Sequence, residues 1–113
     1  MSHVSPCFQQ NQFFVLVEYL TSLHEIYPVR HEFAGYPAAM TLADRVHSDH
    51  DIAPLEASKS YPESIDKVLH FSGKARDIQD FEHFLEQAKS ANIQNLLLLT
   101  GDKLKEHHNC LLY

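Results

Sequence analysis

Four short apolar runs recur along the chain, and each gives way to polar or small residues. They are Phe13–Val17, Ala38–Leu42, Val68–Phe71 and Leu96–Leu99. Continuous apolar runs of this length are typical of strands in a parallel sheet, and we expect the last run to be buried on both faces. Their centres lie roughly 25 to 28 residues apart, about one strand–helix–strand repeat. The pattern therefore predicts an α/β fold with polar groups at the carboxyl ends of parallel strands.

Between the runs, the spacing of apolar residues predicts helices that connect the strands. The clearest helix covers Ile78 to Ala91, whose apolar side chains fall on one face. We expect Asp77 to be its N-cap and Asn92 to take the left-handed turn at its end. A shorter helix is predicted from Pro54 to about Tyr61, just before Pro62.

The two ends of the chain and the first connection are less regular. Residues 1–12 are polar and are expected to be a loose lead-in, so the domain comprises residues 13–113. The connection from Thr21 to Pro37 contains two Pro and a Gly, which leaves room for two helical turns around Ser22–Ile26 or for an irregular connection. A last helix is expected to begin within Leu104–Cys110.

Composition narrows the class of protein. The 113 residues suffice for one domain but are about half of an eight-stranded α/β barrel, which takes about 250 residues. The net charge of −6, without a Lys/Arg stripe, argues against a nucleic-acid partner. Cys7 and Cys110 lack a CxxC spacing, and no run resembles a signal peptide or a membrane span. We expect a soluble cytoplasmic protein.

Two carboxylates stand where strands end. Glu18 follows the first run and shares its face with Phe14 and Leu16, so we expect it to be partly desolvated and suited to general-acid catalysis. The alternative is a solvated carboxylate or one that pairs with an Arg. The turn Thr100–Asp102 follows the last run and is suited to bring backbone N–H groups and a carboxylate to a ligand. Alternatively, Asp102 is the N-cap of the next helix.

Histidine is unusually frequent, with nine residues in the chain. His47, Asp49, His50 and Asp51 gather ligand types that zinc and iron prefer, and His107–His108 add two more imidazoles. Their spacing matches no closed ligand set, so no metal site is expected and the role of this loop stays open. A Cys–His nucleophilic pair is not expected either, because both cysteines stand near the ends of the chain.

The segment Val68–Asp77, the helix after it and the segment Asn92–Asp102 resemble the middle of the methylenetetrahydrofolate reductase family. That family has a strand that ends in His-Leu-Thr, a polar loop with an Arg, a helix that ends in a Gly-Ile-x-Asn turn, and a strand that ends in Gly-Asp. The resemblance is close over residues 66–102 and looser over residues 13–102, where the first strand also ends on a Glu.

The resemblance implies an oxidoreductase of one-carbon metabolism, a flavoprotein built on a TIM barrel. Such an enzyme passes a hydride from NADH or NADPH to FAD and then to 5,10-methylenetetrahydrofolate, which becomes 5-methyltetrahydrofolate. By position, Glu18 is then the general acid that helps to open the folate ring. Asp102 is the carboxylate near the flavin that favours the iminium cation, and His70, Thr100, Gly101 and Asp102 are the residues implied to bind FAD.

With about four parallel strands, the chain is expected to form a partial (β/α)8 barrel, the first half of that fold. Its open strand edges predict self-association or a complementing chain. The alternative is a non-catalytic half-barrel remnant or an interaction module that keeps the fold without the reaction. The two hypotheses differ in whether the purified protein binds flavin.

Overall fold

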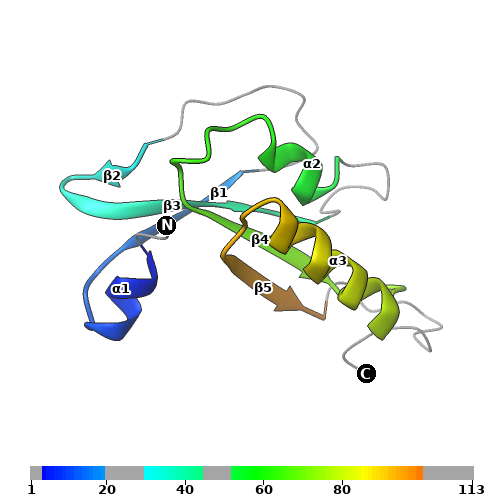
Figure 1. Ribbon diagram of the computed structural model, residues 1–113. Helices are drawn as coiled ribbons and strands as arrows, with labels where there is room; N and C mark the ends of the chain where they lie inside the picture. The colour runs from blue at the N-terminus through cyan, green and yellow to red at the C-terminus, as the bar shows by residue number, and fades with distance from the viewer. Residues whose placement is uncertain (1–3, 20–29, 45–51, 101–113) are drawn as a thin grey trace.

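The computed structural model describes residues 4–19, 30–44 and 52–100 (Figure 1). In chain order, these residues form α1 (Val4–Gln9), β1 (Val15–Tyr19), β2 (Glu32–Phe33), β3 (Tyr36–Leu42), α2 (Pro54–Ser58), β4 (Lys67–Ser72), α3 (Ile78–Ser90) and β5 (Asn95–Leu99). The strands β1, β3, β4 and β5 lie side by side in that order, all parallel, and β2 pairs antiparallel with the start of β3. The expected α/β fold with a parallel sheet is confirmed.

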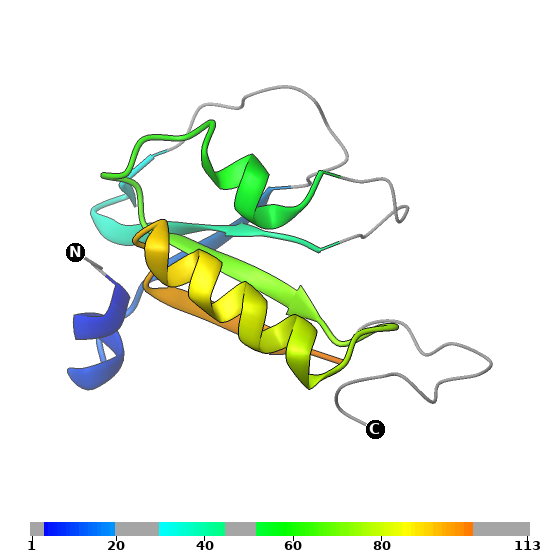
Figure 2. The same ribbon diagram turned by 45° about the vertical axis from the view of Figure 1, so that its right-hand side comes forward.

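One face of the sheet packs against α2 and α3 (Figures 1 and 2). Leu55 of α2 and Phe84 of α3 contact the buried centre, and the ring of Phe71 in β4 lies 5.0 Å from that of Phe84. The buried centre consists of Met40, Leu42, Ile65 and Leu69. Removal of this apolar surface from water holds the two helices on the sheet.

The helix α3 begins where the sequence predicts, has the predicted caps, and ends at Ser90, one residue before the predicted end. The backbone N–H of Asp80 donates to Oδ1 of Asp77 at 2.9 Å, and the N–H of Asp77 donates to Oδ2 of Asp80 at 3.0 Å. This reciprocal pair is a capping box, which satisfies two backbone donors at the start of the helix. Asn92 has a φ of 59°, the left-handed conformation expected after the helix.

The first connection differs from the prediction. Its described part contains β2, which forms a hairpin with β3 through Ala34 and Gly35, whose φ angles are 50° and 84°. Two consecutive positive φ angles are typical of the type I′ turn, whose twist matches that of paired strands. Gly35 thus serves a hairpin and does not interrupt a helix. The helix expected around Ser22–Ile26 and the one expected within Leu104–Cys110 lie outside the described residues.

The N-terminal segment also differs, because the expected loose lead-in contains the helix α1. Its Cys7 is buried, and the helix contacts β3. In both views α1 lies on the other side of β3 from α2 (Figures 1 and 2). The second helix, in turn, ends at Ser58, three residues earlier than predicted.

The leucine run of β5 is not buried on both faces, so that expectation was wrong. Leu97, Leu98 and Leu99 keep 42%, 38% and 37% of their surface exposed. The reason is position in the sheet, because β4 is the one strand that pairs with β5 among the described residues. The two-face burial that the sequence predicts occurs instead in the central strands β3 and β4.

The outer strands β1 and β5 begin at different levels of the sheet. Through the pairing register, Asn95 at the start of β5 lies level with Val68, Thr41 and Glu18. Glu18 is three residues beyond Val15, where β1 begins, and three junctions separate β1 from β5. From β1 to β5 the strand start therefore shifts by three residues over three junctions, although β3 begins two residues before the level of Val15.

Side chains alternate between the two faces of a strand, so the register also defines the face opposite α2 and α3. This face carries Glu18 of β1, Thr41 of β3, and His70 and Ser72 of β4. Thr41, His70 and Ser72 are buried, with 6%, 8% and 5% of their surface exposed. We call these four residues the polar face.

Candidate functional site

The polar face carries the buried imidazole of His70 on β4 and the carboxylate of Glu18 on β1. Burial lowers the pKa of His70, and the negative charges of Glu18 and Asp44 act against that shift. Because its pKa lies below the usual 6.5, the imidazole is neutral near pH 7. A neutral imidazole offers a ligand one hydrogen-bond donor and one acceptor.

Glu18 lies on the predicted face but not in the predicted environment. Leu16 shares its face, as the alternation requires, but both residues are exposed. The expected partial desolvation of this carboxylate is therefore wrong, because β1 is an outer strand of the described sheet. The sheet nevertheless places Glu18 close enough to His70 for its charge to act on the imidazole.

The other predicted site residues follow β5. Thr100 is exposed and stands directly after the strand, at the same edge of the sheet as the end of β4. Gly101 and Asp102 lie outside the described residues, so their predicted roles stay predictions. The structure thus brings His70 and Glu18 onto one face and places Thr100 at the neighbouring strand end.

Two buried side chains of the polar face lack an internal partner. Among the described residues, neither the imidazole of His70 nor the hydroxyl of Thr41 makes a hydrogen bond, although both residues are more than nine-tenths buried. Buried polar groups are normally hydrogen-bonded, and an exception requires an explanation such as a bound group. An ordered water molecule or a bound ligand would meet this requirement.

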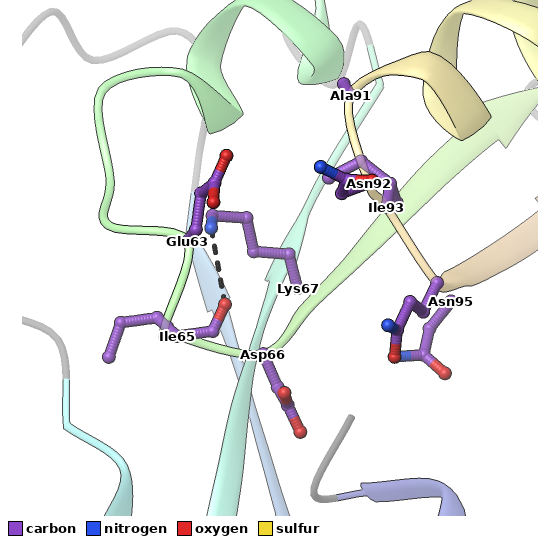
Figure 3. A pocket seen from close by; sticks show the side chains of 9 residues that line it. Glu63, Ile65, Asp66, Lys67, Ala91, Asn92, Ile93 and Asn95 are labelled. Carbon is purple, nitrogen blue, oxygen red and sulfur yellow. Dashed lines mark hydrogen bonds between the residues drawn. The ribbon is translucent and has the colours of Figure 1, made fainter. Parts of the chain in front are cut away.

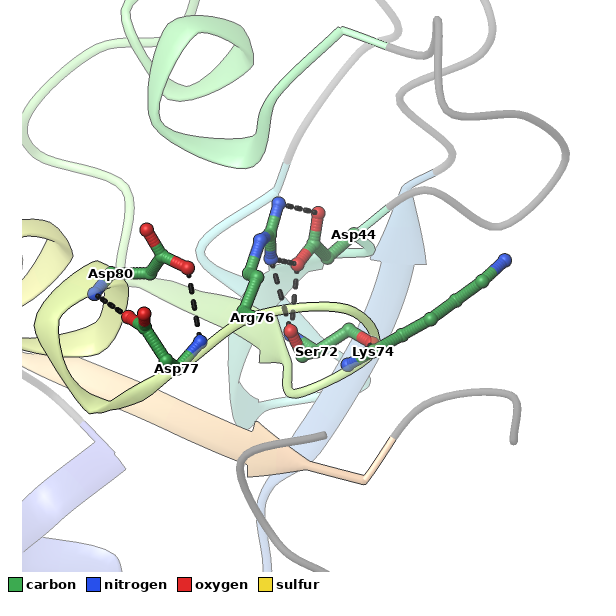
Figure 4. A network of polar contacts seen from close by, with 6 residues as sticks. All are labelled: Asp44, Ser72, Lys74, Arg76, Asp77 and Asp80. Carbon is green, nitrogen blue, oxygen red and sulfur yellow. Dashed lines mark hydrogen bonds and ion pairs between the residues drawn. The ribbon is translucent and has the colours of Figure 1, made fainter. Parts of the chain in front are cut away.

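A network of polar contacts links the loops after β3 and β4 (Figure 4). Oδ2 of Asp44 accepts hydrogen bonds from the backbone N–H of Ser72 at 2.8 Å and from Nη1 of Arg76. Nη2 of Arg76 lies 3.4 Å from Oδ1 of Asp44, and Nη1 also donates to the carbonyl of Ser72 at 3.1 Å. Only 1% of the Asp44 side chain is exposed, against 24% for Arg76.

Arg76 also connects this network to the hydrophobic core, through a contact with Phe71. The guanidinium carbon of Arg76 lies 4.7 Å from the centre of the Phe71 ring, a distance typical of a cation–π contact. Phe71 belongs to the face that packs on α3, and Ser72 belongs to the polar face. Asp44 therefore holds the end of β4, and with it the backbone next to His70, in one position.

The pairing of Asp44 with Arg76 was not predicted from the sequence. The sequence does contain a hint of this pairing, because Asp44 follows the second apolar run almost directly and Arg76 follows the third. The polar ends of neighbouring parallel strands meet at one edge of the sheet. The two residues are 32 positions apart and nothing between them specifies the partner, however, so the pair could be identified only from the strand order.

Two of the cavities that the described residues form lie next to buried charged side chains. The first, of about 510 Å³, lies between α2 and α3 beside Asp44, Arg76 and Phe71. The second, of about 270 Å³, lies at the amino ends of β4 and β5, next to Lys67 and Asn95 (Figure 3). There Nζ of Lys67 donates to the carbonyls of Pro62 at 2.6 Å and Ile65 at 3.2 Å.

Burial lowers the pKa of Lys67, while Glu63 and Asp66 act in the opposite direction. Because its ammonium group already holds two carbonyls of the turn before β4, we assign it a structural role. That position suits this role, because residues at the amino-terminal face of parallel α/β sheets commonly stabilise the fold.

The described residues give no support for a metal site. Within residues 4–19, 30–44 and 52–100, no three His, Cys, Asp or Glu side chains are arranged to hold a metal ion. The loop with His47, Asp49, His50 and Asp51 lies outside these ranges, as do His107 and His108. Cys7 is a free, buried thiol.

No helix among the described residues is long enough and apolar enough to cross a membrane. No protein family, curated protein or solved structure matches this chain in comparisons of sequence and fold.

Proposed function

We propose that this chain forms half of a flavin-binding (β/α)8 barrel of the methylenetetrahydrofolate reductase type. The completed barrel would reduce 5,10-methylenetetrahydrofolate to 5-methyltetrahydrofolate with NADH or NADPH, through FAD. The observation that carries the proposal is the polar face, where Glu18, Thr41 and His70 lie on adjacent strands opposite the helices. Thr41 and His70 are buried there, and their side chains make no hydrogen bond to another described residue. In a barrel of this kind, that face is the interior.

The stagger of the sheet favours barrel closure. A parallel barrel of eight strands has a shear of about 8, or one residue per strand. Between β1 and β5 the strand start shifts by three residues over three junctions, which is the same slope on average.

The polar face fits FAD in its chemistry. The edge of a flavin ring presents hydrogen-bond donors and acceptors, and the neutral imidazole of His70 and the hydroxyl of Thr41 provide matching groups. FAD, when bound, carries the hydride from the pyridine nucleotide to the folate. By the resemblance, Glu18 delivers a proton that helps to open the folate ring, and its exposure on the polar face leaves it accessible to a substrate.

The network of Asp44 with Arg76 supports the site indirectly. By holding the backbone N–H and carbonyl of Ser72, it fixes the end of the strand that presents His70. Preorganised polar groups lose little free energy in reorganisation when a ligand binds, which is a general requirement of catalytic sites.

The test is flavin binding followed by folate-dependent reoxidation of the reduced flavin. We expect the purified chain to quench FAD fluorescence, and a Glu18→Gln variant to keep this binding. The same variant should slow folate-dependent reoxidation by about 10²–10⁴-fold, the usual contribution of a general acid. Glu32→Gln, an exposed carboxylate on β2, is the matched control and should leave both readouts unchanged.

Two results would contradict the proposal. Full folate-dependent turnover in Glu18→Gln would remove Glu18 from the mechanism. A folded chain that binds no flavin would favour the alternative function, a non-catalytic half-barrel or interaction module.

A further inference from the structure

The outer edges of β1 and β5 are the places where the described sheet can be extended. On β5, Leu97, Leu98 and Leu99 are each more than a third exposed. The strand contains no Pro, no Lys and no other charged residue, the features that usually protect an edge strand from pairing. On β1, Leu16 is 48% exposed on the side of the polar face.

We propose that a second copy of this chain occupies both edges, so that two copies close one eight-stranded parallel barrel. In this arrangement, β5 of each copy pairs with β1 of the other. A two-fold axis along the barrel makes both junctions identical and keeps all strands parallel. The inference deepens the proposed function, on which it rests for the barrel architecture, by naming the partner that completes the polar face.

The stagger predicts the register of the new junction. One further residue of shift at the fourth junction completes half of the shear of about 8 that an eight-stranded barrel needs. It places Leu97 opposite Leu16 of the other copy, and Leu99 opposite Glu18 of the other copy. All five residues of β5 then pair with residues 14–18.

The alternation of side chains supports the same register. Leu97 and Leu16 both belong to the side of the polar face, so they can be direct neighbours across a junction. Without the extra shift, Leu97 would stand opposite Val17, whose side chain belongs to the face that packs on the helices. A register that differs by one residue would move every side chain of the strand to the opposite face of the sheet.

Closure by a second copy also explains the exposed residues of the outer strands. Leu16 and Leu97, at 48% and 42% exposure, would cover each other inside the barrel. Glu18 would then stand between Thr41 of its own copy and Leu99 of the other. The carboxylate would gain the partly desolvated surroundings that a single copy does not give it.

The first measurement is the mass in solution. We expect light scattering of the 113-residue chain to give twice its 13.0 kDa, at concentrations of tens of micromolar and without larger species. A chain that stays monomeric at these concentrations would overturn the proposal, and so would an open series of growing oligomers.

The second measurement tests the register by cross-linking. Two variants, Leu16→Cys and Leu97→Cys, are mixed, and a short thiol cross-linker is added. In the mixture each copy carries only one of the two introduced thiols. Within one copy the two positions are also too far apart for a disulfide-length link, because they lie three strand spacings apart across the sheet, about 14 Å, and four residues apart along it. We expect covalent dimers that join residue 16 of one copy to residue 97 of the other, identified by peptide mapping. Linkage of residue 97 to residue 97 alone would overturn the parallel closure.

The third measurement separates the junction from general stability. Leu97→Lys places a charge in the proposed junction, whereas Leu85→Lys changes an exposed leucine of α3, with 37% exposure, outside it. We expect Leu97→Lys to give a folded monomer by circular dichroism and Leu85→Lys to remain a dimer. Two variants that both remain dimers would overturn the proposal.

The experiments can contradict the proposed function and the proposed dimer independently of each other. A dimer with the 16–97 cross-link that binds no FAD would support the closure and contradict the flavin site. A monomer that binds FAD would contradict the closure and leave the flavin site in place.

Discussion

Asp44 shows how much a single carboxylate can contribute to the geometry of the strand ends. Its side chain is 1% exposed, and it accepts from the guanidinium of Arg76 and from the backbone N–H of Ser72. Removal of the charge leaves a cation without its partner beside the core. The network therefore resembles a buried ion pair more than a surface salt bridge, because the carboxylate that accepts these hydrogen bonds is almost completely removed from water.

We expect Asp44→Asn to lower the free energy of unfolding by about 1.5–3 kcal/mol, the range for hydrogen bonds to charged groups. The matched control is Glu56→Gln, which neutralises the exposed pair of Glu56 with Lys59 at 3.0 Å. That change should lower it by no more than about 1 kcal/mol. Urea unfolding of both variants measures the difference, and equal losses would show that the Asp44 network is only a surface pair.

The lowered pKa of His70 predicts that the stability of the fold depends on pH. Burial lowers its pKa in the folded state below the unfolded value of 6.5, so below that pH the unfolded chain binds more protons at this site. The stabilising contribution is complete above the unfolded pKa and is lost as pH falls towards the folded pKa. We expect the loss of stability between about pH 7.5 and about pH 5.5, on either side of the reference pKa, to be smaller in His70→Gln.

His83→Gln, at an exposed position on α3, is the control for the other imidazoles of the chain. Urea unfolding at both pH values gives the comparison. The assignment to His70 would be wrong if both variants lost the same stability as the natural chain on acidification.

At the scale of elements, the capping box of α3 gives a direct test of local structure. Asp77→Ala removes the acceptor for the N–H of Asp80 and should lower stability by about 0.5–2 kcal/mol. Asp77→Asn keeps an acceptor oxygen and should change stability little, since Asn caps as well as Asp. Thermal unfolding distinguishes the two variants, and an equal loss in both would mean that the charge matters more than the cap.

The elements with a strong periodic signal could be predicted from the sequence. The four parallel strands and α3 follow directly from continuous apolar runs and from one apolar helical face. The strand β2 could not, because two residues carry no period and Gly35 permits either a helix break or a hairpin turn. The exposure of the leucines in β5 also escaped prediction, because apolar composition does not reveal whether a strand is central or outermost.

At the scale of the whole molecule, the sequence predicts that Glu18 and His70 lie near the ends of strands. It does not predict that they share one face of the sheet, because that depends on the order of the strands. The pairing of Asp44 with Arg76 depended on the same order. The environment of Glu18 was mispredicted for a related reason, since desolvation depends on what lies beyond β1. The periodicity of one strand contains no information about its neighbours.

The proposed closure by two copies makes stability depend on concentration. If folding and association are coupled, each tenfold rise in protein concentration adds about 1.4 kcal/mol to the stability of the dimer. We expect the urea midpoint to rise between about 1 and about 100 μM, the range in which open strand edges associate. Leu97→Lys should abolish this rise because it places a charge at the junction, whereas Leu85→Lys should keep it. A midpoint that stays constant in the natural chain would show that the outer strands β1 and β5 are stable without a partner.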